Sequence, residues 1–219
     1  DPGMVFVRAD LGQVEPRVLA GVSGDESLVA ASEDDDLYLP VARRLGVERA
    51  IAKVAVLGAM YGQTTGTGAQ VLPQLEAAYP VAMNYLRDAD RLAQGGRELR
   101  THGGRRIAFG AFDANAHDER ALRRIAAARG RYGRNAMVQG AAAELFKVWA
   151  VTVRARCRPL GASIVLCLHD ELLLHVPVEA AAATVELLRS CLDEAAYRWQ
   201  PRTASVRFVA DISVVHSWA

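Results

Sequence analysis

The chain has 219 residues, of which 51% are hydrophobic, and its formal net charge is +1. This length supports one large domain or two small cooperating domains. Its apolar runs fall short of the roughly 18–20 residues that a membrane helix requires. The near-neutral charge does not by itself indicate a nucleic-acid binder. Of the 26 basic residues only Lys53 and Lys147 are lysine. Arginine suits bidentate phosphate contacts, although GC-rich codon usage explains the bias as well.

Hydrophobic periodicity divides the chain into strands and helices. The segments that we predict as strands are residues 4–9, 163–168, 172–176 and 205–215. Those that we predict as helices are residues 14–22, 37–45, 48–62, a pair within 69–98, 119–129, about 134–156 and 179–199. Residues 99–118 are expected to be loop-like or short-stranded. An acidic break at residues 34–36 predicts the N-terminal cap of the helix that follows it.

The order of these elements favours one fold class. An early strand is followed by many helices, then by a tight hairpin, a helix and a final strand. We therefore predict an α+β protein in which the early strand returns to pair with the late hairpin. The three cysteines have no zinc or redox spacing, so we interpret them as small apolar residues in a reducing cytosol.

Two of the predicted strands end in acids. The first apolar run ends at Asp10, and the predicted hairpin turns at His169, Asp170 and Glu171. An acid in a turn is weak evidence alone, because turns often contain aspartate. Here, however, long apolar runs flank the turn and fix its acids at a rim. Carboxylates held on neighbouring strands are what two-metal phosphoryl transfer needs.

The predicted helix over residues 48–62 carries a graded stripe. Arg49, Lys53, Leu57 and Tyr61 recur every four residues and therefore share one face. Its cationic end could hold a polyphosphate, and its aromatic end could stack on a base. For the stripe taken alone, an ordinary amphipathic helix with a solvated basic end is the favoured explanation. Gly62 would open the end of this helix to close approach by a ligand.

A second helix repeats polar residues at the same spacing. Arg131, Asn135 and Gln139 lead into the small residues Gly140, Ala141, Ala142 and Ala143. Amides beside small residues can probe acceptors in the minor groove, where they would check shape rather than sequence. Solvated surface amides are the plainer alternative.

These runs together resemble the motifs of the DNA polymerase I family, the family A DNA polymerases. The run that begins at Asp10, DLGQVEPRVLAGVSGD, is similar to motif A of that family. The run from Arg49 to Gly62, RAIAKVAVLGAMYG, is similar to motif B, and LHDEL at residues 168–172 resembles motif C. The helix from Arg131 resembles the family's primer-template-contacting helix. The resemblance covers essentially the whole chain.

The resemblance implies a fold and a domain organisation. The fold would be a right-hand palm, an antiparallel sheet with helices, plus mostly helical fingers. Residues 1–36 and 135–219 would form the palm, and residues 37–134 the fingers with their return to it. The chain begins at motif A, so we expect the thumb to be absent. We also expect the chain to be a fragment that needs the upstream thumb and exonuclease-like domains of a longer polymerase.

The resemblance also implies roles for single residues. Asp10 and Asp170 would be the catalytic residues and would bind two Mg²⁺ ions, for which Mn²⁺ could substitute. The residues implied to bind the dNTP are Arg49, Lys53, Leu57, Tyr61, Glu15 and Gln13. Among these, Glu15 would exclude a ribose 2′-OH and Tyr61 would stack at the template-base position. The residues implied to contact primer-template DNA are Arg131, Asn135, Gln139, His169 and Glu171, the last in a supporting role.

Several positions depart from the family pattern. Leu57 stands where the family usually has an aromatic residue, Tyr38 where many members have histidine, and Leu11 follows the first aspartate in place of tyrosine. The fingers are short, and in this the chain resembles an actinobacterial exonuclease/polymerase-like branch.

The expected function is template-directed DNA synthesis with dNTPs as substrates, in the cytoplasm at the nucleoid and without a membrane partner. A polymerase-derived remnant that binds primer-template DNA with little turnover is the alternative, because of the departures and the absent thumb. A single-subunit RNA polymerase is a third reading, against which Glu15 argues, since ribonucleotide substrates need no such gate.

Overall fold

A computed structural model describes residues 2–63, 65–109, 118–200 and 205–218. The chain folds into two compact units. The first, here called the sheet unit, comprises residues 1–14, 142–201 and 207–219. The second, the helical unit, comprises residues 15–141 and 202–206.

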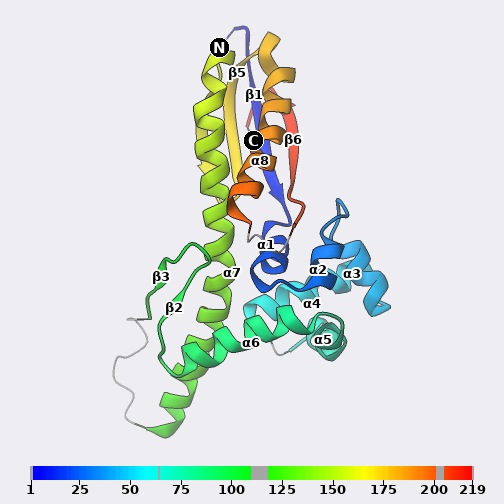
Figure 1. Ribbon diagram of the computed structural model, residues 1–219, viewed down its shortest axis with the longest axis vertical. Helices are drawn as coiled ribbons and strands as arrows, with labels where there is room; N and C mark the ends of the chain where they lie inside the picture. Colours follow the sequence, from blue (N-terminus) through cyan, green and yellow to red (C-terminus); the bar gives the residue numbers. More distant parts are fainter. Residues whose placement is uncertain (1, 64, 110–117, 201–204, 219) are drawn as a thin grey trace. The chain divides into compact units, whose positions relative to one another are not determined.

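The sheet unit is built on one antiparallel sheet of four strands in the order β4-β5-β1-β6 (Figure 1). Its elements are β1 (Met4–Gly12), β4 (Ser163–Leu168), β5 (Glu171–Pro177), α8 (Ala181–Trp199), β6 (Val209–Val215) and the C-terminal part of α7 (Glu119–Cys157). Strand β1 pairs with β5 on one side and with β6 on the other. The α+β class and the return of the early strand to the late hairpin are therefore confirmed.

The two faces of this sheet differ because side chains alternate along β1. Val5, Val7, Ala9 and Leu11 are buried, whereas the intervening residues are half-buried or exposed. Helix α8 packs against β1, β5 and β6. The indole N–H of Trp149 in α7 donates to the Leu188 carbonyl of α8 at 3.1 Å, which joins the two covering helices. One face is thus the core, and the other is open.

The open face carries opposed side chains, because directly paired residues point to the same side of a sheet. The opposed pairs of β1 and β5 on this face are Phe6 with His175, Arg8 with Leu173, and Asp10 with Glu171. Strand β6 adds Val215, Ser213 and Asp211 opposite the same three β1 residues. The face therefore changes from apolar to acidic along its length.

The helical unit holds most of the helices. Its elements are α1 (Val14–Ser23), α2 (Glu26–Ala31), α3 (Tyr38–Leu45), α4 (Arg49–Tyr61), α5 (Thr67–Ala78), α6 (Pro80–Gln94), β2 (Leu99–Arg100), β3 (Arg106–Ile107) and the N-terminal part of α7. Helix α4 packs against α3 and α5. Helix α6 ends before the short β2–β3 hairpin, whose apolar residues Leu99 and Ile107 pack with Ala89 and Ala93 of α6.

Helix α7 corrects one sequence prediction. A break at Gly130 between two helices is wrong, because α7 continues without interruption from Glu119 to Cys157. A Cβ atom at Gly130 would lie 2.2 Å from Asp90 Oδ1, and one at Gly133 would lie 2.5 Å from the Ala93 Cβ. The glycines therefore allow α6 to lie close against α7 and do not end the helix.

The structure also describes the three cysteines and the apolar content of the helices. Cys157 and Cys191 are buried, Cys167 is exposed, and all three are free thiols. Within the described residues, no helix is both long enough and apolar enough to span a membrane.

Candidate functional site

The two predicted metal ligands lie close together in the sheet unit. Asp10 sits near the end of β1, and Asp170 is in the two-residue turn between β4 and β5. The Leu11 N–H donates to the Asp170 carbonyl at 3.1 Å, outside the regular ladder. This bond ties the turn to β1 beside Asp10, so the sheet fixes both carboxylates at one rim.

The backbone around this rim is unusual. In the described part of the chain, Gln13 and His169 are the non-glycine residues with a positive φ, both at 54°. Such angles are uncommon outside glycine. Gln13 lies directly between β1 and α1, and His169 precedes Asp170 in the turn. Both predicted substrate-contacting residues are therefore held in tight turns beside the acids, and the His169 side chain is exposed.

The electrostatics of Asp10 favour a bound cation. Its pKa is raised above the ordinary value, chiefly by burial and then by the neighbouring Asp170 carboxylate, while Arg8 opposes the shift. A divalent cation would remove this repulsion. Within the described residues, no group of three or more histidine, cysteine or acidic side chains converges as a complete cage. An oxygen-only pair fits Mg²⁺, which keeps water and substrate phosphates among its ligands.

Glu171 is held by the chain itself. Its Oε2 accepts a hydrogen bond from Arg8 Nε at 2.6 Å, and its Oε1 accepts one from the Trp218 indole at 2.9 Å. Burial pushes the pKa of Glu171 up, but these hydrogen bonds and the charge of Arg8 bring it below its ordinary value. Glu171 is therefore an ionised, anchored carboxylate, although sequence reasoning placed it among DNA contacts.

The graded stripe exists on α4 in the helical unit. Arg49 and Lys53 are exposed, and Leu57 and Tyr61 are half-buried. The Arg49 guanidinium forms an ion pair with Asp36 and lies 5.8 Å from the centre of the Tyr38 ring. The pKa of Tyr38 is raised to about 12, first by burial and then by Glu15 and Asp36. The ring is thus a neutral platform beside the arginine.

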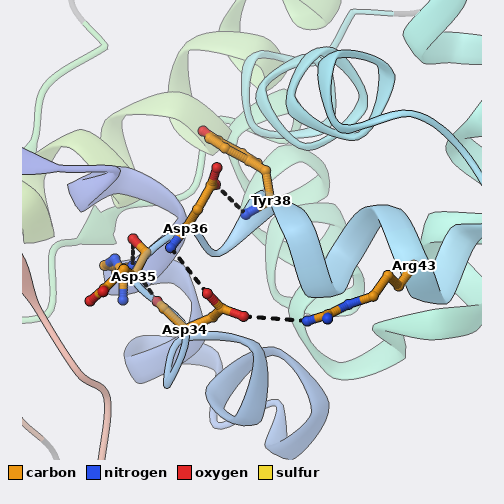
Figure 2. A network of polar contacts seen from close by, with 6 residues as sticks. Asp34, Asp35, Asp36, Tyr38 and Arg43 are labelled. Carbon is orange, nitrogen blue, oxygen red and sulfur yellow. Dashed lines mark hydrogen bonds and ion pairs between the residues drawn. The ribbon is translucent and has the colours of Figure 1, made fainter.

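The acidic turn at residues 34–36 is held by several hydrogen bonds, of which Figure 2 draws those of Asp34 with Arg43 and of Asp36 with the Tyr38 N–H. Arg17 is fully buried and donates to the carbonyls of Ser32, Asp34 and Asp35 at 2.6–2.8 Å. With the carbonyls held inward, the Asp36 carboxylate accepts the Tyr38 N–H at 3.0 Å at the start of α3. Asp36 thus binds a backbone N–H at the start of α3, although the N-cap residue of this helix is Leu37, which makes no side-chain capping hydrogen bond.

Three residues with different predicted roles meet in the helical unit. The Tyr61 hydroxyl donates to Glu15 Oε2 at 2.8 Å, and Tyr61 also has a hydrogen bond with Gln139. The pKa of Tyr61 is raised to about 12, by burial first and then by Glu15. Residues from α1, α4 and α7 are thereby joined through one phenol.

A hollow of about 420 Å³ lies between the β2–β3 hairpin and α7. Asn135 and Gln139 line it from α7, and Arg105 and Arg106 line it from the hairpin. Gly140 makes this packing feasible, since a Cβ there would lie 2.3 Å from the Thr101 methyl group. Sequence reasoning missed both arginines. The Gly-Gly-Arg-Arg run at residues 103–106 is the signal that a hairpin with a basic tip could have given.

The predicted Arg131 has a different setting. A Cβ at Gly62 would lie 2.9 Å from Arg131 Cγ, and Gly62 adopts a φ of +68°. The close approach expected at Gly62 is therefore made by the Arg131 side chain. Arg131 is itself exposed, whereas Asn135 is half-buried.

Comparison with known proteins agrees with these motifs. A family model described as DNA polymerase family A matches residues 1–219. The DNA polymerase I of Chloroflexus aurantiacus is 34% identical over 215 residues, which cover 88% of this chain and 22% of that protein. A thermostable DNA polymerase I of Thermus filiformis is 30% identical over 210 residues, 89% of this chain and 25% of that protein. The chain thus spans a quarter or less of these relatives.

A solved structure matches the fold. It is the POL domain of Pol1 from M. smegmatis in complex with a DNA primer-template and dNTP. The match has a TM-score of 0.78 and 25% sequence identity, and it covers all of this chain and 41% of that one. The α+β fold of this chain thus matches that of a polymerase domain.

Proposed function

Because the chain belongs to DNA polymerase family A, we propose that it adds dNTPs to a primer 3′-OH under the direction of a DNA template, with release of pyrophosphate. The observation that carries this proposal is the pair Asp10 and Asp170, tied together by the bond from Leu11 to the Asp170 carbonyl. From the resemblance of their motifs, both residues would correspond to the family's metal-binding carboxylates.

Asp10 and Asp170 would hold the divalent metal, with Mg²⁺ as the expected ion and Mn²⁺ as a substitute. When bound, two such ions activate the 3′-OH and stabilise the pyrophosphate leaving group. The chain's own contribution is to fix two carboxyl groups at one sheet rim, where the charge of Asp170 acts on Asp10 and a cation would relieve the repulsion. His169, exposed in the same turn, would contact the primer terminus.

The face of α4 would bind the incoming nucleotide. Arg49 and Lys53 are exposed cations one turn apart and suit a triphosphate. Glu15, held by the Tyr61 hydroxyl, would stand against the ribose 2′-OH, with Gln13 nearby in sequence and Leu57 beside the sugar. Tyr61 would stack at the template-base position, with its neutral phenol anchored by that same bond.

The hollow beside α7 would contact the primer-template duplex. Asn135 and Gln139 offer amides suited to minor-groove acceptors, and Arg131 is an exposed cation on the same helix. Arg105 and Arg106 would add phosphate contacts from the β2–β3 hairpin. We further propose that residues 1–36 and 135–219 form the palm and residues 37–134 the fingers.

The direct test is primer extension on a recessed duplex with Mg²⁺ and dNTPs. The parent chain should add at least one nucleotide, and Asp170→Ala should reduce the rate by about 10³-fold or more, because metal binding supplies several kcal/mol. Asp193→Ala is the matched control. It removes an exposed aspartate on α8 in the same unit and should leave extension unchanged.

The second candidate is a primer-template binding protein derived from a polymerase. The hollow lined by Arg105, Arg106, Asn135 and Gln139 favours it, because these residues could bind DNA without the two aspartates. Fluorescence anisotropy with the same duplex separates the two functions. DNA binding without any extension, in the parent and in Asp170→Ala alike, would reject synthesis and support binding alone.

A further inference from the structure

An arginine stands among the carboxylates of the open sheet face. Asp10 lies opposite Glu171 on one side and opposite Asp211 on the other. Arg8 is two residues before Asp10 on β1, so its side chain is on this same face. The negative charges of Glu171, Asp10 and Asp211 all raise the pKa of its guanidinium. A cation built into an acid-rich rim affects whatever other cation binds there.

Glu171 has both carboxylate oxygens occupied from within the sheet unit. Arg8 Nε binds Oε2 at 2.6 Å, and the Trp218 indole binds Oε1 at 2.9 Å. The Glu171 side chain is 12% exposed, whereas that of Arg8 is 47% exposed. The carboxylate is thus fixed and shielded, and the arginine that holds it is accessible to solvent. For Glu171 to bind a metal, it would have to exchange these partners.

We propose that Arg8 is a positioning residue that keeps Glu171 out of the metal site and thereby sets the metal affinity of Asp10 and Asp170. This inference rests on the proposed function, since it concerns the same metal site. Its physical basis is that Arg8 satisfies a third carboxylate which stands directly opposite Asp10 and would otherwise be an oxygen ligand for a hard cation.

As a consequence, Asp10 and Asp170 should bind a metal ion weakly in the absence of substrate. Pairing Glu171 with Arg8 lowers the negative charge of the rim that Asp10, Asp170 and Asp211 share, and Arg8 opposes cation binding through its own charge. A metal then needs the oxygens of a bound triphosphate to complete its coordination. Removing the charge of Arg8 should release Glu171 and tighten metal binding to the bare chain.

The test is a titration of the chain with Mn²⁺ alone, without DNA or nucleotide. Electron paramagnetic resonance measures the concentration of the free ion at each step. Arg8→Gln keeps a hydrogen-bond donor and removes the charge. We expect it to bind Mn²⁺ roughly fivefold more tightly than the parent. Adding Glu171→Gln to Arg8→Gln should return the affinity to the parent value or below it.

Trp218→Phe is the matched control. It removes the other hydrogen bond of Glu171 but leaves the Arg8 ion pair, and we expect its Mn²⁺ affinity to stay within about twofold of the parent. Arg8→Lys keeps the charge and should resemble the parent more than Arg8→Gln does. Circular dichroism melting of each variant establishes that the sheet unit is folded during the titration.

The outcomes separate this inference from the function on which it rests. If the parent binds Mn²⁺ equally well after Asp10→Asn combined with Asp170→Asn, the metal site itself is wrong and the proposed function fails. If parent binding depends on these aspartates but Arg8→Gln binds no more tightly, only the role of Arg8 is overturned. Persistent tight binding in the Arg8→Gln, Glu171→Gln double variant would overturn the role of Glu171.

Discussion

The two units treat their charges in opposite ways. In the sheet unit, Asp10 and Asp170 are brought together, and the pKa of Asp10 rises because burial and the second carboxylate both disfavour its ionised form. In the helical unit, Arg49 is paired with Asp36, and Arg17 is surrounded by backbone carbonyls. The sheet unit thus places the like charges of Asp10 and Asp170 together beside its Arg8–Glu171 ion pair, whereas Arg49 and Arg17 in the helical unit each have oxygen partners.

This difference matches the proposed ligands of the two units. A rim on which the charge of Asp170 disfavours ionisation of Asp10 attracts a cation, and the cation stabilises the folded state when it binds. A helix whose arginine already has a carboxylate partner can exchange that partner for a phosphate with little net change in charge. Residues whose charges are satisfied inside the fold should affect stability, whereas residues whose charges face a ligand should affect binding. Variants of each kind can test this distinction.

The largest effect on folding is expected from Arg17→Met. The substitution leaves the carbonyls of Ser32, Asp34 and Asp35 without their buried donor. We expect a loss of about 3–5 kcal/mol in unfolding free energy, measured by urea denaturation. Arg43→Met is the control, because Arg43 pairs with Asp34 at the surface of the same turn and should cost less than about 0.5 kcal/mol. Equal losses would show that the buried cation is not what holds the turn.

The next effect concerns nucleotide binding by Lys53, an exposed cation of the stripe on α4. Lys53→Ala removes an exposed cation from α4 and should raise the KM for dNTP roughly 10–100-fold, with a smaller effect on kcat. Steady-state primer extension measures both constants. Lys147→Ala is the natural control, since it removes the other lysine of the chain, which is exposed on α7. A KM that does not change in Lys53→Ala would remove this residue from the nucleotide site.

Sugar selection should depend on the Glu15 and Tyr61 pair. Glu15→Ala removes the carboxylate proposed to exclude the 2′-OH and should improve use of ribonucleotides relative to dNTPs by roughly 10–100-fold. Tyr61→Phe removes the hydroxyl, with its 2.8 Å hydrogen bond to Glu15 and its hydrogen bond with Gln139, and keeps the ring. It should relax sugar selection less than Glu15→Ala does, because the Glu15 carboxylate is kept and loses only the hydrogen bond from Tyr61. Competition between dNTP and NTP in single-nucleotide extension distinguishes the two variants.

In the sheet unit, removing a charge at Asp10 should stabilise the chain, whereas Arg17→Met in the helical unit should destabilise it. Because its pKa is raised in the folded chain, Asp10 contributes stability below its ordinary pKa, and this contribution is lost as the pH rises through the higher, folded pKa. At neutral pH without metal, Asp10→Asn should therefore stabilise the chain by about 0.5–2 kcal/mol while abolishing extension. The difference should vanish in acid. Added Mg²⁺ should raise the melting temperature of the parent only.

Much of this site could be predicted from the sequence, because its signals are local. The acids at strand ends and the four-residue spacing of Arg49, Lys53 and Tyr61 require only the periods of a strand and a helix. The partners of these residues could not be predicted, since they come from distant segments. Asp36, which pairs with Arg49, lies just before α3. Arg8 pairs with Glu171 although 163 positions separate them in the sequence.

The misreading of Gly130 has the same origin. A glycine inside a helical pattern indicates either an end or a close contact, and the sequence alone favours the end. The contact that decides the matter is with Asp90 on α6, which no local pattern contains. The β2–β3 arginines were missed because their proximity to Asn135 depends on the packing of Gly140 against Thr101.

The smallest expected effect tests whether pairing restrains the helical unit's arginine. Asp36→Asn removes the charge that holds Arg49, and its amide oxygen can still accept the Tyr38 N–H at the start of α3. An exposed ion pair is worth about 0.2–1 kcal/mol, so inorganic tripolyphosphate should bind roughly two- to fivefold more tightly in calorimetric titration. Asp35→Asn changes the same charge in the same turn and should have less than half this effect. Weaker binding in Asp36→Asn would mean that the carboxylate orients Arg49 for phosphate rather than competing with it, and the proposed exchange of partners would be wrong.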